Sequence, residues 1–262
     1  AERMTRRAGK RWLWALALLL LFLAAAWFTE CSPARFWARR GHLTDLISAM
    51  FPPDWGYTSR ILTPLLATVQ MSVTGTALGA FLALLAAPLC AENLQAFGPV
   101  RFLLRLLIQI LRSFPALILA LLATFVFGLG TFSGTAAITV YPFAIWTRLT
   151  YGDIEAAPLA PYQALCAMGA APAGAYWRAV VPGIAPSYFS NVLYLLETNV
   201  RHSAILGYVG AGGIGLLLNE KISWLEYSRV GMILLLLFLT VCIIEGISSL
   251  LLQMIREERR LS

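Results

Sequence analysis

The chain has 262 residues, 59% of them hydrophobic and only 13% charged, with a formal net charge of +7 at pH 7. This composition excludes an ordinary soluble domain, in which about a quarter of the residues are charged, and predicts an integral membrane protein in a lipid bilayer. Basic residues that flank apolar stretches account for the positive charge. They form no aromatic-interleaved patch of the kind that binds nucleic acid, so no nucleic-acid partner is expected.

Six apolar stretches approach the roughly 20 residues that a helix needs to cross the hydrocarbon core of a bilayer. They lie at residues 12–28, 63–87, 102–127, 134–151, 184–209 and 230–252. Glycine or proline interrupts the second, third and fifth stretches, at Gly75, Gly79, Pro115, Pro186 and Gly207, which leaves their ends less sharply defined. The sequence thus predicts an all-α fold of six transmembrane helices in a single domain, residues 1–262.

The distribution of Lys and Arg predicts which side of the membrane each segment occupies. An even number of spans places both termini on one side, and the basic tail at residues 1–11 indicates that this side is the cytoplasm. The loops 29–61 and 207–215 then lie outside, and the loop 152–183 lies inside. Arginines in the first outer loop oppose this assignment without outweighing the tail. The first stretch also resembles a signal peptide, but its roughly 17 apolar residues favour an uncleaved anchor.

The third stretch carries an arginine deep in the apolar sequence. Arg112 precedes Ser113-Phe114-Pro115, and the proline frees a backbone carbonyl one turn earlier that needs a partner. Arg105, seven residues before Arg112, lies on the same helical face and can extend toward the cytoplasmic interface. Helix packing and the lining of a transport path both remain open as roles for Arg112.

The loop 152–183 is the most informative segment of the chain. Residues 162–168 are helix formers, and Gly169, Pro172 and Pro182 interrupt the pattern, so we expect two short helices with enforced bends outside the bilayer. The segment contains Pro161, Tyr162, Gln163, Ala164, Leu165, Gly169, Val181 and Pro182.

The fifth stretch is the richest in polar groups. Glu197 and Arg201 are four residues apart, which places them on one helical face where they can neutralise each other. Charges at such depth cost about 2.5–3.5 kcal/mol each on insertion scales, so they face partners or water rather than lipid. They form either a buried ion pair that fixes helix packing or, together with Asn199 and His202, the lining of a path for an anion.

Glycines dominate the segment 207–215, which includes Gly210, Gly212, Gly213 and Gly215. Each glycine costs about 1 kcal/mol relative to alanine in a helix, so the segment is not expected to continue the fifth span. Non-helical backbone at membrane depth is tolerated where it lines a cavity or is covered by protein. We therefore expect it to form the outer mouth of the path, with a flexible outer loop as the alternative.

The sequence lacks the motifs that are typical of ATP hydrolysis, metal binding and intramembrane catalysis. There is no Gly-x4-Gly-Lys-Ser/Thr motif, so we expect no ATP hydrolysis by this chain, and any ATP-derived energy has to come from a partner. The cysteines form no Cys-x-x-Cys pair and no histidine cluster accompanies them, so neither a metal site nor a bound cofactor is expected. An intramembrane enzyme that uses His202 and Ser203 is disfavoured, because adjacent helical residues point about 100° apart.

The loop 152–183 resembles the Glu-Ala-Ala-x3-Gly-x9-Ile-x-Leu-Pro motif of ABC importer permeases, whose short coupling helix docks in a cleft of a cytoplasmic ATPase. Gly169 and Pro182 are retained, and Gln163, Leu165, Ala179 and Val181 replace the Glu, the second Ala, the Ile and the Leu. Further segments resemble the permeases of phosphonate importers: Phe51-Pro52-Pro53-Asp54, Ala91-Glu92-Asn93-Leu94, Arg112-Ser113-Phe114-Pro115, Gly128 to Gly134, and Glu197 through Gly215.

The resemblance implies a type I importer permease of the bacterial inner membrane. It implies a homodimer, two cytoplasmic ATPase subunits that bind ATP and Mg²⁺, and a solute-binding protein outside the membrane. Phosphonate or a related phosphorus oxyanion would be imported by alternating access. Tyr141-Pro142 replaces a His-Thr pair of the family and Leu195-Leu196 an Arg-Phe pair, which leaves another small solute open as the cargo. An ion-gradient-driven transporter is the remaining alternative, but the internal repeats common in such folds are not evident.

Overall fold

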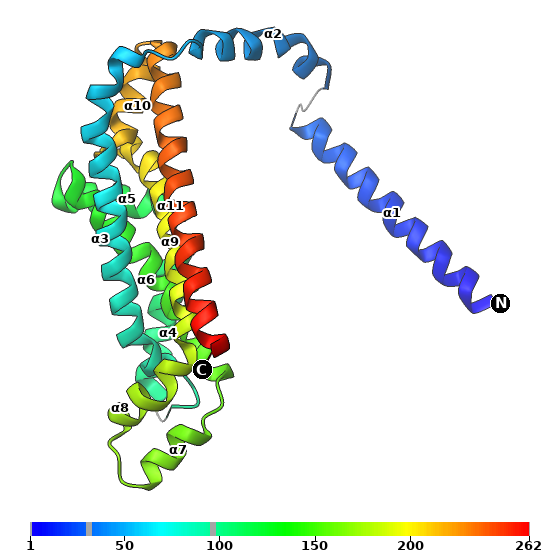
Figure 1. Ribbon diagram of the computed structural model, residues 1–262. Coiled ribbons are helices and arrows are strands. Elements are labelled where there is room, and N and C mark those ends of the chain that lie inside the picture. Colours follow the sequence, from blue (N-terminus) through cyan, green and yellow to red (C-terminus); the bar gives the residue numbers. More distant parts are fainter. Residues whose placement is uncertain (1, 30–32, 95–97, 262) are drawn as a thin grey trace. The chain divides into compact units, whose positions relative to one another are not determined.

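The computed structural model describes residues 2–29, 33–94 and 98–261, and the chain is predominantly helical there (Figure 1). Of the predicted basic tail, only the backbone of residues 2–11 is described, as helix, so the side chains that support the orientation lie outside the described residues. Contacts divide the chain into two compact units, Ala1–Pro52 and Pro53–Ser262.

In its described residues, the first unit consists of α1 (Glu2–Phe28) and α2 (Pro33–Met50). The helix α1 contains the first predicted span, with a short apolar part at Trp14–Phe28. The helix α2 lies within residues 29–61, which were expected to form a loop. The sequence did not predict this helix, because it is rich in polar residues and lacks a long apolar stretch.

The second unit is a bundle of helices in which α6 lies at the centre, packed against α3, α4, α5 and α9. In chain order its elements are η1 (Trp55–Tyr57), α3 (Thr58–Cys90), α4 (Gly98–Ser113), α5 (Ala116–Phe127), α6 (Thr131–Ala156), α7 (Ala160–Ala167), α8 (Pro172–Ala175), η2 (Tyr176–Val180), α9 (Val181–Leu206), η3 (Gly207–Val209), α10 (Ile214–Ser223) and α11 (Tyr227–Leu261). The five predicted spans in this unit coincide with helices, except that the third is divided between α4 and α5.

Small residues bring α3 and α6 into close contact. A methyl group at Gly75 would lie 2.8 Å from Ile138, and one at Gly79 would lie 2.9 Å from the Thr139 carbonyl. Two glycines four residues apart on one helical face allow two backbones to approach closely inside a membrane. Gly75 and Gly79 were expected to blur the second span, but α3 continues through both, and they serve helix packing instead.

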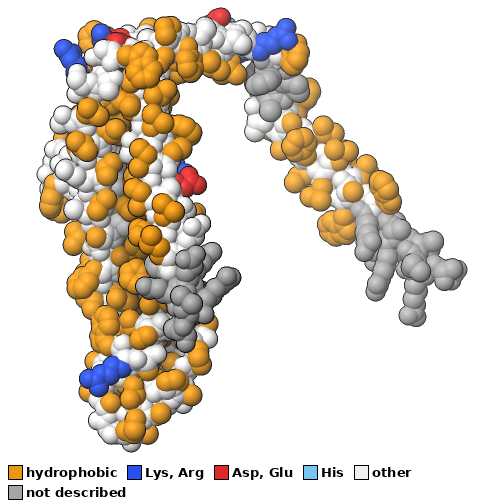
Figure 2. Space-filling view, viewed as in Figure 1, with side chains coloured by type: hydrophobic (Ala, Val, Ile, Leu, Met, Phe, Trp, Pro, Cys, Tyr) orange, Lys and Arg blue, Asp and Glu red, His pale blue; other side chains and the backbone are white. Residues whose placement is uncertain are grey.

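Three helices of the described chain are long and apolar enough to cross a membrane: Trp55–Cys90, Pro172–Val209 and Tyr227–Met254. A fourth crossing is possible if α4 and α5 are counted together. The fourth predicted span lies in α6, which is not among these apolar helices. Its side chains Trp146, Thr147 and Ile154 are fully buried in the bundle. Figure 2 shows apolar side chains over most of the visible face of the long helices.

The third predicted span is not one straight helix. The axis bends by 98° between α4 and α5, at the residues 114–115. Pro115 cannot donate a backbone hydrogen bond and restricts Phe114 to extended conformations, so α4 ends at Ser113. The sequence identified Pro115 as a breaker, but the single span 102–127 has to be replaced by two differently directed helices.

Candidate coupling helix and membrane-embedded polar site

The residues between α6 and α9, which we call the coupling segment, leave the bundle at the end of α6 and form the short helix α7. At the end of α7, the N–H of Gly169 donates to the Cys166 carbonyl and the N–H of Ala170 donates to the Leu165 carbonyl, both at 3.0 Å. This type of helix end requires a residue in the left-handed region, and Gly169 supplies it with φ of +90°. The sequence placed both the helix and its end correctly.

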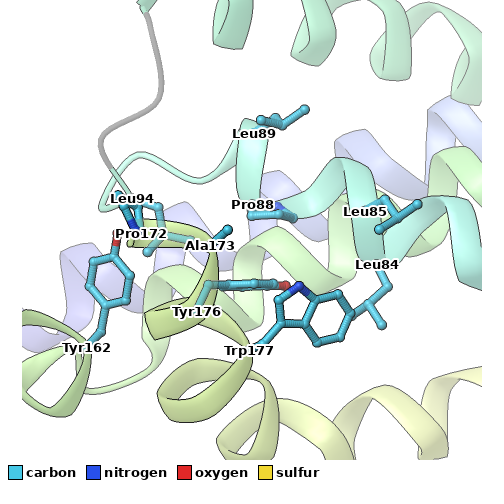
Figure 3. A pocket seen from close by; sticks show the side chains of 10 residues that line it. All are labelled: Leu84, Leu85, Pro88, Leu89, Leu94, Tyr162, Pro172, Ala173, Tyr176 and Trp177. Carbon is cyan, nitrogen blue, oxygen red and sulfur yellow. The ribbon is translucent and has the colours of Figure 1, made fainter. Parts of the chain in front are cut away.

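Half-buried residues anchor α7 while others remain free. Leu159 and Tyr162 pack against the buried cluster at the ends of α3, α4 and α6. Tyr162 also lines an apolar pocket of about 350 Å³, which Figure 3 shows between the end of α3 and the coupling segment. Burial and then a hydrogen bond with Cys166 raise the pKa of the Tyr162 hydroxyl, so this anchor stays neutral. Gln163 and Ala164 are exposed and available to a partner.

The remaining coupling residues support this helix. Pro161 lies in the first turn of α7, where a missing N–H costs nothing, and Leu165 is half-buried. After α8, one turn of π-helix leads directly into α9, which begins at Val181. Val181 packs against the same buried cluster as Tyr162. Pro182 occupies the first turn of α9, so it starts the next long helix.

The expected ion pair is present on α9. The Arg201 guanidinium donates to the Glu197 carboxylate at 2.6 Å, with the Glu197 side chain 16% exposed and the Arg201 side chain 50% exposed. The pair is therefore accessible from the Arg201 side only. His202 is half-buried, and its ring makes an edge contact with Tyr141, with ring centres 5.9 Å apart.

Asn199 belongs to a buried polar seam between α3 and α9 rather than to an exposed surface of this unit. Its side-chain amide donates to the Thr76 hydroxyl at 2.8 Å, and one turn along α9 the Ser203 and Ser72 hydroxyls share a 2.7 Å hydrogen bond. Thr68 continues the seam on α3. The four-residue spacing of Thr68, Ser72 and Thr76 places them on one helical face, and this signal was missed in the sequence.

The Gly-rich segment is closely packed backbone. Gly210, Gly212 and Gly213 all have positive φ, and the N–H of Ile214 donates to the Thr68 hydroxyl at 2.7 Å as α10 begins. A methyl group on Gly215 would lie 2.0 Å from the Ala204 carbonyl oxygen. The expectation of a non-helical turn is confirmed at residues 210–213, whereas Gly215 lies in α10, a helix that was not predicted.

Among the described residues, Arg112 makes no hydrogen bond or ion pair with the polar groups of α9 or of the Gly-rich segment. It occupies the last turn of α4, next to the bend, and its side chain is exposed. Among the described residues it has no ion-pair partner. Charged side chains exposed on membrane helices normally face water or protein; the two roles predicted for Arg112, helix packing and the lining of a transport path, both stay predictions.

A cluster that joins α4 to the ends of α3 and α6 was missed in the sequence. Arg105 on α4 forms ion pairs with Glu92, after α3, and with Glu155, near the end of α6. Its Nε also donates to the Cys90 carbonyl at 2.8 Å. The sequence reading gave Arg105 an interfacial position but no partner, because the residues that meet are up to 50 positions apart.

A second cluster lies at the opposite end of the unit. Glu226 accepts a 2.6 Å hydrogen bond from Arg229, and Asp54 pairs with Arg229 at 3.3 Å. Lys221 lies 3.2 Å from Glu226. Next to Glu226 in the chain, just after the end of α10, Leu225 is 67% exposed and has a positive φ of 56°, a conformation that bulky residues rarely adopt. The ion pairs therefore hold a strained, exposed apolar residue in place.

A bundle of apolar helices with a short helix projecting from it is typical of the transmembrane subunit of a transporter. The chain belongs to the family of binding-protein-dependent transport system inner membrane components, whose family model matches residues 75–256.

Relatives agree with this assignment, and a solved structure shares the fold. The chain is 32% identical over 210 residues to the phosphite transport system permease protein PtxC of Stutzerimonas stutzeri, covering 80% of this chain and 76% of that protein. It is 33% identical over 209 residues to the phosphate-import permease protein PhnE of Mycolicibacterium smegmatis, covering 78% of this chain but only 38% of that protein. The fold matches the MetNI methionine ABC transporter in an inward-facing conformation with a TM-score of 0.67 at 20% identity, covering 76% of this chain and 98% of that chain.

Proposed function

We propose that this permease subunit moves a phosphorus oxyanion, such as phosphite, phosphate or a phosphonate, into the cytoplasm in an ATP-driven importer. The observation that carries the proposal is the family match over residues 75–256 together with an anchored coupling helix whose Gln163 and Ala164 are exposed. The names of the two relatives, a phosphite and a phosphate permease, support an oxyanion as the cargo.

The partners follow from this assignment. Two ATPase subunits, which bind ATP and Mg²⁺, dock on α7 of two permease copies in a homodimer, and this chain itself binds no cofactor. Because α7 is anchored through Tyr162 and Leu159 to the ends of three helices, a movement of the ATPases is passed to the bundle. ATP and the loaded binding protein each have to favour one of two conformations for transport to proceed.

We propose that both termini and α7 lie in the cytoplasm and that α10 lies outside the inner membrane, as the distribution of Lys and Arg in the sequence favours. The binding protein docks at the outer end, where Leu225 and the neighbouring Trp224 are strongly exposed. The ion pairs around Glu226 hold this surface in one conformation, which lowers the entropic cost of docking. Strain at an exposed residue of this kind is common at binding surfaces.

Passage of an anion requires polarity without tight binding. Arg201 meets this requirement, because half of its side chain is exposed while Glu197 neutralises it. The replaced family residue at position 195 alters packing instead: Leu195 is buried against Trp146 and Tyr188. Arg201, with Arg112 and His202, therefore remains the source of donors along the path.

Transport into proteoliposomes tests the proposal. The permease, its ATPase and its binding protein are reconstituted, and uptake of radiolabelled phosphite and phosphate is measured with and without ATP. Uptake that requires ATP and the binding protein, and that vanadate inhibits, supports the proposal. Uptake that continues without the ATPase and follows an ion gradient would establish the secondary transporter instead. ATP-dependent uptake of another solute only would leave the importer and replace the cargo.

A further inference from the structure

We propose that Arg105 is a positioning residue for transport, which joins α4 to the end of α6 so that movement of the coupling segment reaches Arg112. The inference rests on the proposed importer function and concerns the transmission of movement within one subunit. The inference also assigns a role to the segment Ala91-Glu92-Asn93-Leu94, which otherwise only forms the turn after α3.

Arg105 holds three segments together. Its Nε donates to the Cys90 carbonyl at 2.8 Å and its Nη1 to Glu92 at 3.2 Å, while its Nη2 pairs with Glu155. The same Glu155 oxygen accepts the backbone N–H of Glu92 at 3.0 Å. We call Arg105, Glu92, Glu155 and the Cys90 carbonyl the Arg105 cluster. Arginine suits this position because its planar group offers several donors in fixed directions, which lysine does not.

Two further contacts, from Asn93 and from Arg105, join other segments to the last turns of α6, and Arg148 adds a contact within α6 itself. The Asn93 side chain donates to the Ile154 carbonyl at 2.9 Å. The guanidinium groups of Arg105 and Arg148 both lie over the Tyr151 ring, 4.8 and 4.7 Å from its centre. Because α6 ends at Ala156 and α7 begins at Ala160, the Arg105 cluster lies at the start of the coupling segment.

The helix α4 can transmit this movement as one rigid helix, separate from α5. Its Ile108 is buried in the cluster that also contains Ile154 and Tyr151. Arg112 follows Arg105 by seven residues, so both lie on the same face two turns apart. The 98° bend after Ser113 separates α4 from α5. A displacement of Glu155 therefore moves α4 and Arg112 without requiring α5 to follow.

If the ion pair between Arg105 and Glu155 only stabilised the fold, its loss would have a different effect on transport. Partly exposed pairs contribute little to stability, and their loss would lower ATP hydrolysis and uptake together through the amount of folded complex. Loss of a transmitting contact instead lowers the amount of cargo moved per ATP hydrolysed. The ratio of the two rates is the readout that separates these roles.

The experiment uses the reconstituted complex with its ATPase and binding protein, and inorganic phosphite and phosphate as probes. Arg105→Gln and Glu155→Gln are compared with the exchanged pair Arg105→Glu with Glu155→Arg. Arg101→Gln is the matched control, since Arg101 is one turn away on α4 and forms no ion pair with a described residue. We expect each glutamine variant to lower the uptake-to-hydrolysis ratio roughly tenfold, as networks of this kind carry such couplings. We expect the exchanged pair to recover at least part of it.

The outcomes distinguish the inference from the proposed function. If the unmodified complex moves neither anion, the cargo assignment fails, and the same ratio is measured with the solute that the binding protein carries. If the unmodified complex transports but the ratio stays constant in both glutamine variants, Arg105 has only a structural role. Should Arg105→Gln fail to assemble, Glu155→Gln decides the question, because it leaves the bonds from Arg105 to Cys90 and Glu92 intact.

Discussion

The guanidinium of Arg201 is half exposed, whereas the Glu197 carboxylate that it neutralises is mostly buried. Replacing Arg201 by Leu should therefore stop uptake and leave an uncompensated charge on α9, while the distant ATPase sites keep their basal hydrolysis. Uptake and ATP hydrolysis by the reconstituted complex measure both effects. Because loss of one partner of a buried pair is costly, some loss of thermal stability is also expected.

A neutral pair separates these two consequences. In the double variant Glu197→Gln with Arg201→Gln, the buried charge is gone and thermal stability should return toward that of the unmodified protein. Uptake should remain low, because the half-exposed cation is still missing. Uptake restored together with stability would mean that the pair only fixes helix packing.

At position 169 the backbone conformation, and not the available space, limits which residues are tolerated. No atom lies within 4 Å of a methyl group added to Gly169. At its φ of +90°, Gly169→Ala should destabilise the end of α7 by about 1 kcal/mol and weaken co-purification with the ATPase. Gly169→Asn should be milder, since asparagine tolerates positive φ better. The control is Gly174→Ala, which also has open space around it but needs no positive φ. Equal binding by all three variants would contradict a coupling role for the end of α7.

At the scale of elements, the junction of α10 and α11 depends on a titratable group. The hydrogen bond from Arg229, followed by that from Lys221, lowers the pKa of Glu226 below its ordinary value. Because the unfolded chain has the higher pKa, this contribution to stability is present above about pH 4.3 and is lost as the pH falls through the lowered value.

Thermal unfolding between pH 6 and pH 3 measures this contribution. The unmodified protein should lose more of its unfolding temperature over this range than Glu226→Gln does, since the variant has no carboxylate to protonate at that position. Asp45→Asn is the control, because Asp45 in α2 is exposed, lies outside the predicted spans and forms no ion pair with a described residue. Identical pH profiles for the unmodified protein and Glu226→Gln would exclude this role of Glu226.

Elements set by local signals were predicted well from the sequence. The helix α7 and its end at Gly169 follow from helix formers bounded by Pro and Gly, and the pair Glu197–Arg201 follows from a four-residue spacing. The helix α10 was missed because ten residues are too few for a hydropathy search. The 98° bend between α4 and α5 was missed because Pro115 fixes where a helix ends, while the new direction depends on packing against other helices.

Contacts between distant segments could not be derived in the same way. The pairing of Arg105 with Glu155 depends on how α4 and α6 pack, and nothing in a single sequence selects Glu155 over other acidic residues. Asn199 illustrates the same limit: a polar residue in a span can face a path or a buried partner, and only the position of Thr76 decides for the partner. The sequence therefore located the polar segments but not the direction in which each side chain points.

At the scale of the whole molecule, the proposed mechanism requires α7 and Leu225 to lie on opposite sides of the membrane. The chain offers a native reporter, because Cys166 in α7 is a half-buried free thiol. In a variant whose Cys31, Cys90 and Cys242 are replaced by Ala, a membrane-impermeant maleimide should leave intact cells unlabelled and should label Cys166 after permeabilisation. Bound ATPase should then slow this labelling, since it covers α7.

The matched variant carries Leu225→Cys and Cys166→Ala in the same background. Leu225 is strongly exposed at the outer end, so this variant should be labelled in intact cells, and the binding protein should protect it. Labelling of Cys166 in intact cells, with Leu225→Cys reached only after permeabilisation, would reverse the orientation and place the coupling helix where no ATPase can reach it. Labelling of both positions from one side would contradict a bundle that crosses the membrane between them.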